Sequence, residues 1–379
     1  MSDFSLLTWV LVVAALVVGI LAGHFGWGKR WPGSSKLHPD YLAGLDFLVT
    51  EQPDRALDVF LKLMEANADT IETHFALGAL YRRRGEVERA IRIHQNLLAR
   101  SELASEHREQ ALLALARDYL RAGVLDRAER LFQQVSEVAR LRSSALDALR
   151  GVYERQHDWQ QALQAYRELV RVKAAPPPNV AGHYLCELAL QALERDDVTQ
   201  AREFLREVAR EISPFPRAAL LRAELAHREG DNGLAVQLLR EALNEAPALL
   251  QDELPNLVKW VGEESQQGML SDLAAEAAAG DFEDRKRLVF AAFAAGVASS
   301  QSLKDSVQEV FARDPVLCAV WNAAPEQYPR VALEIGALLE HAEKYRCNEC
   351  GFSTRSFYWQ CPACHAWDSF DTYAIIKLR

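Results

Sequence analysis

Residues 74–91 read HFALGALYRRRGEVERAI and hold the pattern that decides the fold. A small residue at Gly78 precedes an aromatic one at Tyr81, and Ala90 follows Gly85 by five residues. The glycine at position 85 marks a turn between two helices. Small residues at Gly78 and Ala90 let these helices approach closely, and Tyr81 fills the space beside them. The stretch therefore predicts a helix-turn-helix unit.

The same arrangement recurs from about Leu37 to about residue 250. The alanine of the second helix is found in six units, as Ala56, Ala90, Ala128, Ala162, Ala201 and Ala235. These alanines follow one another at 34, 38, 34, 39 and 34 residues, which resembles the 34-residue tetratricopeptide repeat. The longer spacings hold insertions around Ser101–Arg108 and at Ala174–Pro178, where consecutive prolines predict a loop.

One such unit cannot bury its apolar face alone, so the repeats are expected to stack into a superhelical solenoid. The repeated aromatic residues and alanines are interpreted as core packing. Binding is expected in a concave groove lined by the first helices. Beyond residue 250 the register blurs, but apolar residues at helical spacing predict further helices. These are Ser271–Gly280, Arg285–Gly296, Ser302–Arg313 and Val331–Tyr345.

Four of the six cysteines lie in the last 33 residues, as two Cys-x-x-Cys pairs. Each pair forms a tight knuckle that directs two sulfurs at one point, and two knuckles complete a tetrahedron. Gly351 follows the first knuckle, where a turn with positive φ favours glycine. We therefore predict one metal ion, iron or zinc, held by four thiolates. The ligands are Cys347, Cys350, Cys361 and Cys364.

Two other interpretations of these cysteines compete with the metal site. Two disulfides would close strained loops and need an oxidising compartment. Cys361-Pro-Ala-Cys364-His365 also fits the pattern for covalent haem attachment, but it leaves the first pair unexplained. His365 is interpreted as an exposed knuckle residue. Cys186 and Cys318 lie in apolar helical stretches and are interpreted as small buried hydrophobic residues.

Residues 4–23 read FSLLTWVLVVAALVVGILAG and carry no charge. Twenty helical residues span ~30 Å, about the thickness of the hydrocarbon layer, which predicts a transmembrane anchor. A cleaved signal peptide is disfavoured because no Lys or Arg precedes the apolar run. Lys29, Arg30 and Lys36 follow it, so the positive-inside rule predicts a periplasmic N-terminus and a cytoplasmic body. A cytoplasmic body keeps thiols reduced, which favours metal over disulfides.

The 379 residues carry a formal net charge of −10, with no basic stripe, so nucleic acid is not expected as a partner. Phosphate-binding loops, dinucleotide fingerprints and the common hydrolase motifs are absent from the sequence. We expect no enzyme activity. A homo-oligomer is compatible with the sequence, which does not specify the oligomeric state.

An N-terminal anchor, a tetratricopeptide solenoid and a C-terminal rubredoxin-like metal module, in this order, resemble one bacterial inner-membrane family. It is the lipopolysaccharide assembly protein B family, and the resemblance covers essentially the full chain. The four cysteines at 347, 350, 361 and 364 match the family's metal-binding cysteines by motif. His365 is a departure, since these knuckles often have glycine there, and it puts the local turn geometry in doubt.

The resemblance implies a regulator of lipopolysaccharide synthesis. Such proteins help a membrane-bound, ATP-dependent metalloprotease to degrade the deacetylase that commits precursor to lipid A. They also respond to a membrane partner that senses lipopolysaccharide. Two rival functions stay open, a rubredoxin-like electron carrier and a tethered scaffold for another envelope pathway.

The expected fold is all-α, a tetratricopeptide solenoid with a transmembrane helix at its N-terminus and a small rubredoxin-like tetrathiolate domain at its C-terminus. The sequence divides into an anchor at 1–24, a basic linker at 25–36, repeats at 37–250, degenerate helical repeats at 251–345 and a metal-binding domain at 346–379. The metal module is expected to fold the C-terminus and dock it against the repeats.

Overall fold

The computed structural model describes residues 39–50, 52–66, 71–174, 176–298, 300–313 and 343–372. The predicted anchor, the basic linker and Cys318 lie outside these residues. Within the described ranges, no helix is both long and apolar enough to cross a membrane. The chain divides into two compact units, Met1–Val124 and Leu125–Arg379, which are described separately.

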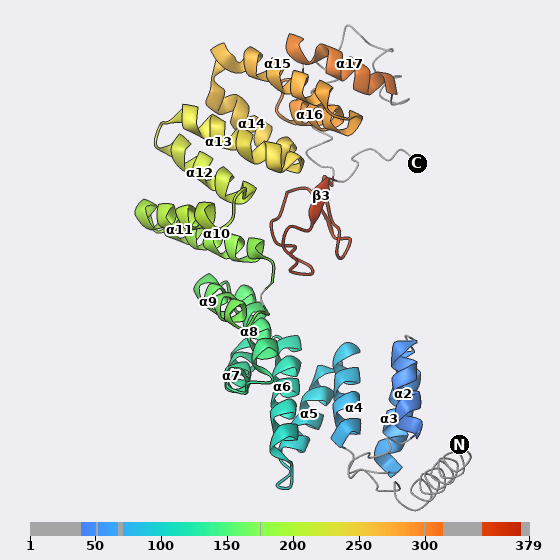
Figure 1. Cartoon of the computed structure of the whole chain (residues 1–379). Coiled ribbons are helices and arrows are strands. Elements are labelled where there is room, and N and C mark those ends of the chain that lie inside the picture. The colour runs from blue at the N-terminus through green and yellow to red at the C-terminus, as the bar shows by residue number, and fades with distance from the viewer. Residues whose placement is uncertain are drawn as a thin grey trace, which may run out of the picture. The chain divides into compact units, whose positions relative to one another are not determined.

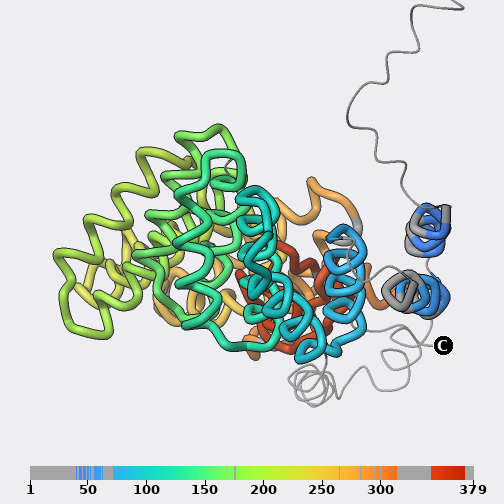
Figure 2. Tube along the Cα trace, turned by 90° about the horizontal axis from the view of Figure 1, so that it is seen from below, coloured from blue at the N-terminus to red at the C-terminus, as the bar shows by residue number. Residues whose placement is uncertain are grey.

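The described chain is built mainly from helices that follow one another in antiparallel pairs (Figure 1). The first unit contains α2 (Pro39–Val49), α3 (Pro53–Ala66), α4 (Ile71–Arg83), α5 (Val87–Leu98) and α6 (Ser105–Arg121). The repeats of the second unit contain α7 (Leu125–Ser136), α8 (Arg142–Gln156), α9 (Trp159–Arg171), α10 (Pro178–Glu194), α11 (Val198–Glu211), α12 (Pro216–Arg228) and α13 (Asn232–Glu245). In the second unit, α7 to α13 stack side by side in chain order (Figures 1 and 2).

The repeat alanines occupy the positions that the sequence predicts. All six lie in second helices and are 0% exposed. In the first unit, Gly78 faces the ring of His94, and a Cβ at this glycine would collide with that ring. His94 is held in turn by buried Asp118, whose Oδ2 lies 2.5 Å from Nδ1. The close approach of α4 and α5 therefore requires the small residue at position 78.

Five turns between paired helices, from the α4–α5 turn to the α12–α13 turn, share one backbone conformation. Gly85, Gly123 and Gly230 have φ of 82°, 75° and 86°, and His157 and Asp196 take the same left-handed region at 56° and 59°. In each turn, the next N–H donates to a carbonyl five residues back, as in a Schellman C-cap. Two of the five turns thus form without the glycine that marks the others.

Six more helical elements follow the repeats within the described residues. They are η1 (Pro247–Leu249), α14 (Leu250–Val261), α15 (Glu263–Ala279), α16 (Phe282–Ala294), η2 (Gln301–Leu303) and α17 (Lys304–Arg313). The predicted helix start at Ser271 is wrong, because α15 already begins at Glu263. Gly262, with φ of 76°, ends α14 and lets the chain turn there. Ser271 lies on an exposed face inside α15 instead of capping it.

The last predicted helix, Val331–Tyr345, lies outside the described residues up to position 342. Its end is wrong, because Tyr345 belongs to a strand. A small antiparallel sheet has the order β2-β1-β3, made of β1 (Tyr345–Cys347), β2 (Ser353–Thr354) and β3 (Phe370–Thr372). Tyr345 pairs with Thr354 on one side and with Thr372 on the other. The metal module therefore begins with β1.

Candidate metal centre and its docking surface

The two Cys-x-x-Cys segments form matching backbone turns. In the first, the Gly351 N–H donates to the Cys347 carbonyl at 2.9 Å, and in the second the His365 N–H donates to the Cys361 carbonyl at 2.8 Å. Gly351 has φ of 78° and His365 has φ of 61°. Histidine thus adopts the left-handed conformation that glycine takes in the first knuckle. The departure at His365 leaves the turn geometry intact.

The knuckles bring the four predicted ligands together, with all Sγ atoms within 4.8 Å of one another. Two sulfur pairs, Cys347 with Cys364 and Cys350 with Cys361, are each separated by 3.7 Å. A regular tetrahedron with metal–sulfur bonds of ~2.3 Å has edges of about 3.8 Å. The four cysteines therefore form a tetrathiolate site of the size that one zinc or iron ion needs.

The protonation of the sulfurs also fits a bound cation. Burial raises the pKa of Cys347, but a hydrogen bond with Ser369 and backbone N–H groups lower it to about 6. At Cys364, the Ala366 N–H lowers the pKa, but partial desolvation and the other three sulfurs raise it to about 12. Four adjacent thiolates repel one another, so a divalent cation is what allows all four to lose their protons.

One end of the module docks on α10 and α12 through Trp367 and Asp368. His183 of α10 is completely buried and stacks on the Trp367 ring, with centroids 4.5 Å apart and planes at 13°. Its Nε2 lies 2.8 Å from Oδ1 of Asp368, and the amide of Asn179 donates to Oδ2 at 2.5 Å. Arg217 of α12 lies over the Trp367 ring at 5.9 Å.

These contacts fix the protonation of His183. The carboxylate of Asp368 accepts from Nε2–H, while Nδ1 faces the guanidinium of Arg217 at 3.4 Å and must accept. This is the neutral imidazole. Burial lowers the pKa of His183, and Asp368 offsets only part of that effect. The docking contact is therefore built for an uncharged histidine.

A second contact lies on α8. Trp367 Nε1 donates to the buried carboxylate of Glu154 at 3.2 Å. Arg150 donates to the same carboxylate at 2.6 Å and to the hydroxyl of Tyr184 at 2.9 Å. Burial and the neighbouring Glu154 raise the pKa of Tyr184, which keeps the phenol protonated. The indole of the module thus completes a polar network inside the repeats.

The other end of the module docks on α14. Asp252 accepts from the Lys344 ammonium at 3.0 Å and from the Phe357 N–H at 3.2 Å. The Tyr345 hydroxyl donates to the Ala248 carbonyl at 3.3 Å. The rings of Phe357 and Trp359 pack against the apolar core that α12 to α17 share. Both ends of the module are therefore held by the helical scaffold.

The docking residues of the helices lie mostly on α8, α10, α12 and α14, which are the first helices of their pairs. Both views show the module beside these helices (Figures 1 and 2). The groove in which the sequence predicts client binding is thus partly covered in the second unit by the chain's own C-terminus. Cys186, as predicted, is a buried thiol, and burial raises its pKa to about 12.

Comparisons with known proteins agree with this architecture. A family described as a rubredoxin metal binding domain matches residues 345–372, and the tetratricopeptide repeat matches residues 73–109 and 145–179. The chain resembles lipopolysaccharide assembly protein B of Escherichia coli K12, with 29% identity, across 92% of this chain and 95% of that protein. The protein of the same name from Haemophilus influenzae is 27% identical over the same shares.

Solved structures with partial similarity to this chain include repeat proteins. The C-terminal part of a TPR repeat-containing protein from Cytophaga hutchinsonii is 13% identical, covers 77% of this chain and 99% of its own, and has a TM-score of 0.42. The resemblance stated from the motifs is confirmed by the two relatives named lipopolysaccharide assembly protein B and by the matches to the repeat and rubredoxin families.

Proposed function

We propose that this chain, which resembles lipopolysaccharide assembly protein B along nearly its whole length, is an adaptor that regulates lipopolysaccharide biosynthesis. The observation that supports this most is the combination of a match over 92% of the chain with a metal module docked on the repeats. The proposed action is recruitment without chemistry. The described residues offer surfaces and a structural metal site for it.

The proposed partners follow from the resemblance. The adaptor brings the deacetylase that commits precursor to lipid A to a membrane-bound, ATP-dependent metalloprotease, and a lipopolysaccharide-sensing membrane protein relieves this degradation. The anchor at residues 4–23 is proposed to hold the body at the cytoplasmic face of the inner membrane. Tethering raises the effective concentration of the scaffold near other membrane proteins.

The metal ion is proposed to fold the C-terminal module. Binding to four thiolates supplies on the order of 10 kcal/mol to such small units, which is most of their folding free energy. With the module folded, Trp367 and Asp368 reach the helices, and Lys344 reaches Asp252. In the first unit, the first helices α2, α4 and α6 are the proposed client surface, because the module covers the equivalent helices of the second unit.

The variant Cys347→Ser tests this function in cells that lack their own copy of the gene. We expect loss of the bound metal, a longer half-life of the deacetylase and its accumulation. Cys186→Ala is the matched control, since this cysteine is buried in α10 and is not one of the four clustered cysteines. Its deacetylase half-life should equal that of the wild type. Full adaptor activity in a metal-free Cys347→Ser protein would contradict the proposal.

The electron-carrier alternative has one observation in its favour, the exposure of Cys350 and Cys364 at the module surface. Solvent-exposed ligands allow electron exchange in iron tetrathiolate sites. If this function holds, the purified protein is coloured, contains iron and is reversibly reducible. A colourless zinc protein that supports deacetylase turnover excludes it.

A further inference from the structure

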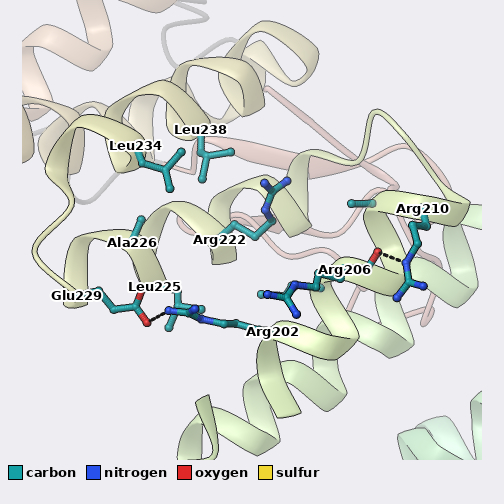
Figure 3. Close-up of a pocket in the computed structure, with 11 residues that line it drawn as sticks. Arg202, Arg206, Arg210, Arg222, Leu225, Ala226, Glu229, Leu234 and Leu238 are labelled. Atoms are coloured by element: carbon teal, nitrogen blue, oxygen red, sulfur yellow. Dashed lines mark hydrogen bonds and ion pairs between the residues drawn. The ribbon is translucent and has the colours of Figure 1, made fainter. Parts of the chain in front are cut away.

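A basic hollow lies between α11, α12 and α13, outside the metal module and its contacts (Figure 3). Its volume is about 540 Å³. Apolar side chains line it together with a row of arginines. The lining residues that matter are Arg202, Arg206, Arg210, Arg222, Leu205, Leu225, Leu234 and Leu238. On α12 the hollow uses Arg222 and Leu225, whereas Arg217 faces the module.

The arginines of this hollow are largely uncompensated. Arg202 forms an ion pair with Glu229. Arg206, Arg210 and Arg222 are exposed and, within the part of the chain that the structure describes, have no acidic partner. Three unpaired cations gather here in a chain of net charge −10. Like charges repel each other, so an anionic occupant of the hollow would offset the repulsion among these side chains.

The spacing of the arginines indicates an elongated occupant. Arg202, Arg206 and Arg210 are four residues apart on α11, so they rise ~6 Å from one to the next. Acidic residues four apart on a partner helix have the same rise, and each could meet one arginine. A single phosphate group, in contrast, needs guanidinium groups that converge on one point. Figure 3 shows them spread along the hollow.

The apolar side chains of the hollow set a second requirement for its occupant, which is an apolar surface of its own. Leu205, Leu225 and Leu238 are buried, and Leu234 stays 42% exposed at the edge. A neighbouring hollow of about 270 Å³ shares Ala209 and Arg222 with the first. It continues past Pro214 and Phe215, which lie just before α12. Together they form a groove that takes apolar side chains along one side and carboxylates along the other, as an amphipathic helix presents them.

The far end of the groove argues against a membrane surface. Glu241 and Glu245 of α13 line the second hollow. A bilayer with anionic lipids presents a plane of negative charge, which these two carboxylates repel. A folded segment of a protein can avoid them by its own pattern of charges.

We propose that the groove formed by α11, α12 and α13 binds an acidic amphipathic helix of a partner protein. Carboxylates of that helix pair with Arg206, Arg210 and Arg222, and its leucine-like side chains cover Leu225 and Leu234. This proposal is independent of the proposed adaptor role. Binding of the peptide to the purified protein can be measured whatever pathway the protein serves.

The test is a titration of the full-length protein in detergent against a fluorescein-labelled helical peptide, followed by fluorescence anisotropy. The peptide has about 18 residues, enough for roughly five turns, with Glu every fourth residue and Leu on the adjoining face. We expect saturable binding that weakens with salt. Arg206→Glu with Arg210→Glu should weaken it about tenfold, because two attractions become repulsions.

Three further measurements make the outcome decisive. Arg130→Glu, at an exposed arginine of α7, should leave the affinity within about twofold of the wild type. A peptide with Lys in place of each Glu should bind weakly to the wild type and regain affinity for the doubly reversed variant. Leu234→Ser should weaken the binding of the acidic peptide without changing the salt dependence of that binding.

The proposal is overturned by any of three results. The first is no saturable binding of the acidic peptide to the wild type. The second is equal affinity for the wild type and the Arg206→Glu, Arg210→Glu protein. The third is binding of anionic phospholipid vesicles that depends on these arginines while the peptide does not bind, which assigns the groove to a lipid surface.

Discussion

At the scale of single residues, backbone conformation explains a position that sequence motifs leave in doubt. The two knuckles need a residue with positive φ after the second cysteine, and Gly351 and His365 both supply it. A side chain in the left-handed region costs about 1 kcal/mol relative to glycine. The second knuckle therefore carries a small strain that the first one lacks.

This difference predicts opposite effects of two substitutions. Gly351→Ala should lower the free energy of unfolding by about 1 kcal/mol, since a Cβ there takes an unfavourable φ and lies 3.3 Å from Arg346 Nη2. His365→Gly should raise it by roughly 0.5 kcal/mol, because glycine's greater freedom in the unfolded chain offsets part of the gain. Chemical unfolding of the metal-loaded protein measures both. Changes of the same sign would show that the knuckles are not equivalent.

At the scale of elements, the helix pairs were predictable because the same small and aromatic residues recur at the helix contacts of each repeat. Ala90 and its counterparts are fully buried, as the spacing predicts. Helix boundaries were less predictable where the sequence does not mark the turn with glycine. His157 and Asp196 adopt positive φ without glycine, and Ser271 resembles a cap but lies inside α15.

The metal ligands were predictable for the same reason, since their spacing is local. The docking of the module was expected, but its residues were not identified. His183 and Asp368 are 185 residues apart in sequence. His183 could not be identified from the sequence, because a lone histidine on an apolar helix carries no signal of its distant partner. Only the packing of the module on α10 brings the two together.

The docking contact predicts a dependence of stability on pH. His183 faces Asp368 from the module, Arg217 from α12 and Glu187 from its own helix. Its pKa is lowered in the folded protein, so protons bind more readily to the unfolded chain. The stability that neutral His183 contributes is complete above the ordinary pKa of about 6.5 and is lost as the pH falls below it.

Asp368 acts in the same direction at lower pH. Burial raises its pKa, but the contacts with His183 and Asn179 outweigh this effect and leave the pKa lowered. Its contribution is present above the ordinary pKa of about 3.9 and is lost as the pH falls through the lowered value.

We therefore expect the thermal unfolding midpoint of the second unit to fall between about pH 7 and pH 5, the range in which free histidine gains its proton. His183→Gln is the matched control, because its amide can donate to Asp368 and accept from Arg217 without titrating. The midpoint of this variant should depend less on pH over the same range. An equal dependence in both proteins would remove His183 from the explanation.

At the scale of the whole molecule, the C-terminal module, which we propose is folded by one metal ion, is held on first helices of the second unit. At one end of the module Lys344 contacts α14, and at the other end Trp367 contacts α8. The proposed role of the metal is to shape the module, and the proposed binding surfaces are the arginine groove and the first helices of the first unit.

Hydrogen exchange by mass spectrometry, on the full-length protein with and without its metal, tests this central claim most directly. Removal of the metal should speed exchange in residues 343–372 and also in the facing parts of α10 and α14, around His183 and Asp252, because their docked partner unfolds. Exchange in α4 and α5 should stay unchanged. If the module loses its protection while α10 and α14 keep theirs, the metal does not hold the module on the repeats and the claim is contradicted.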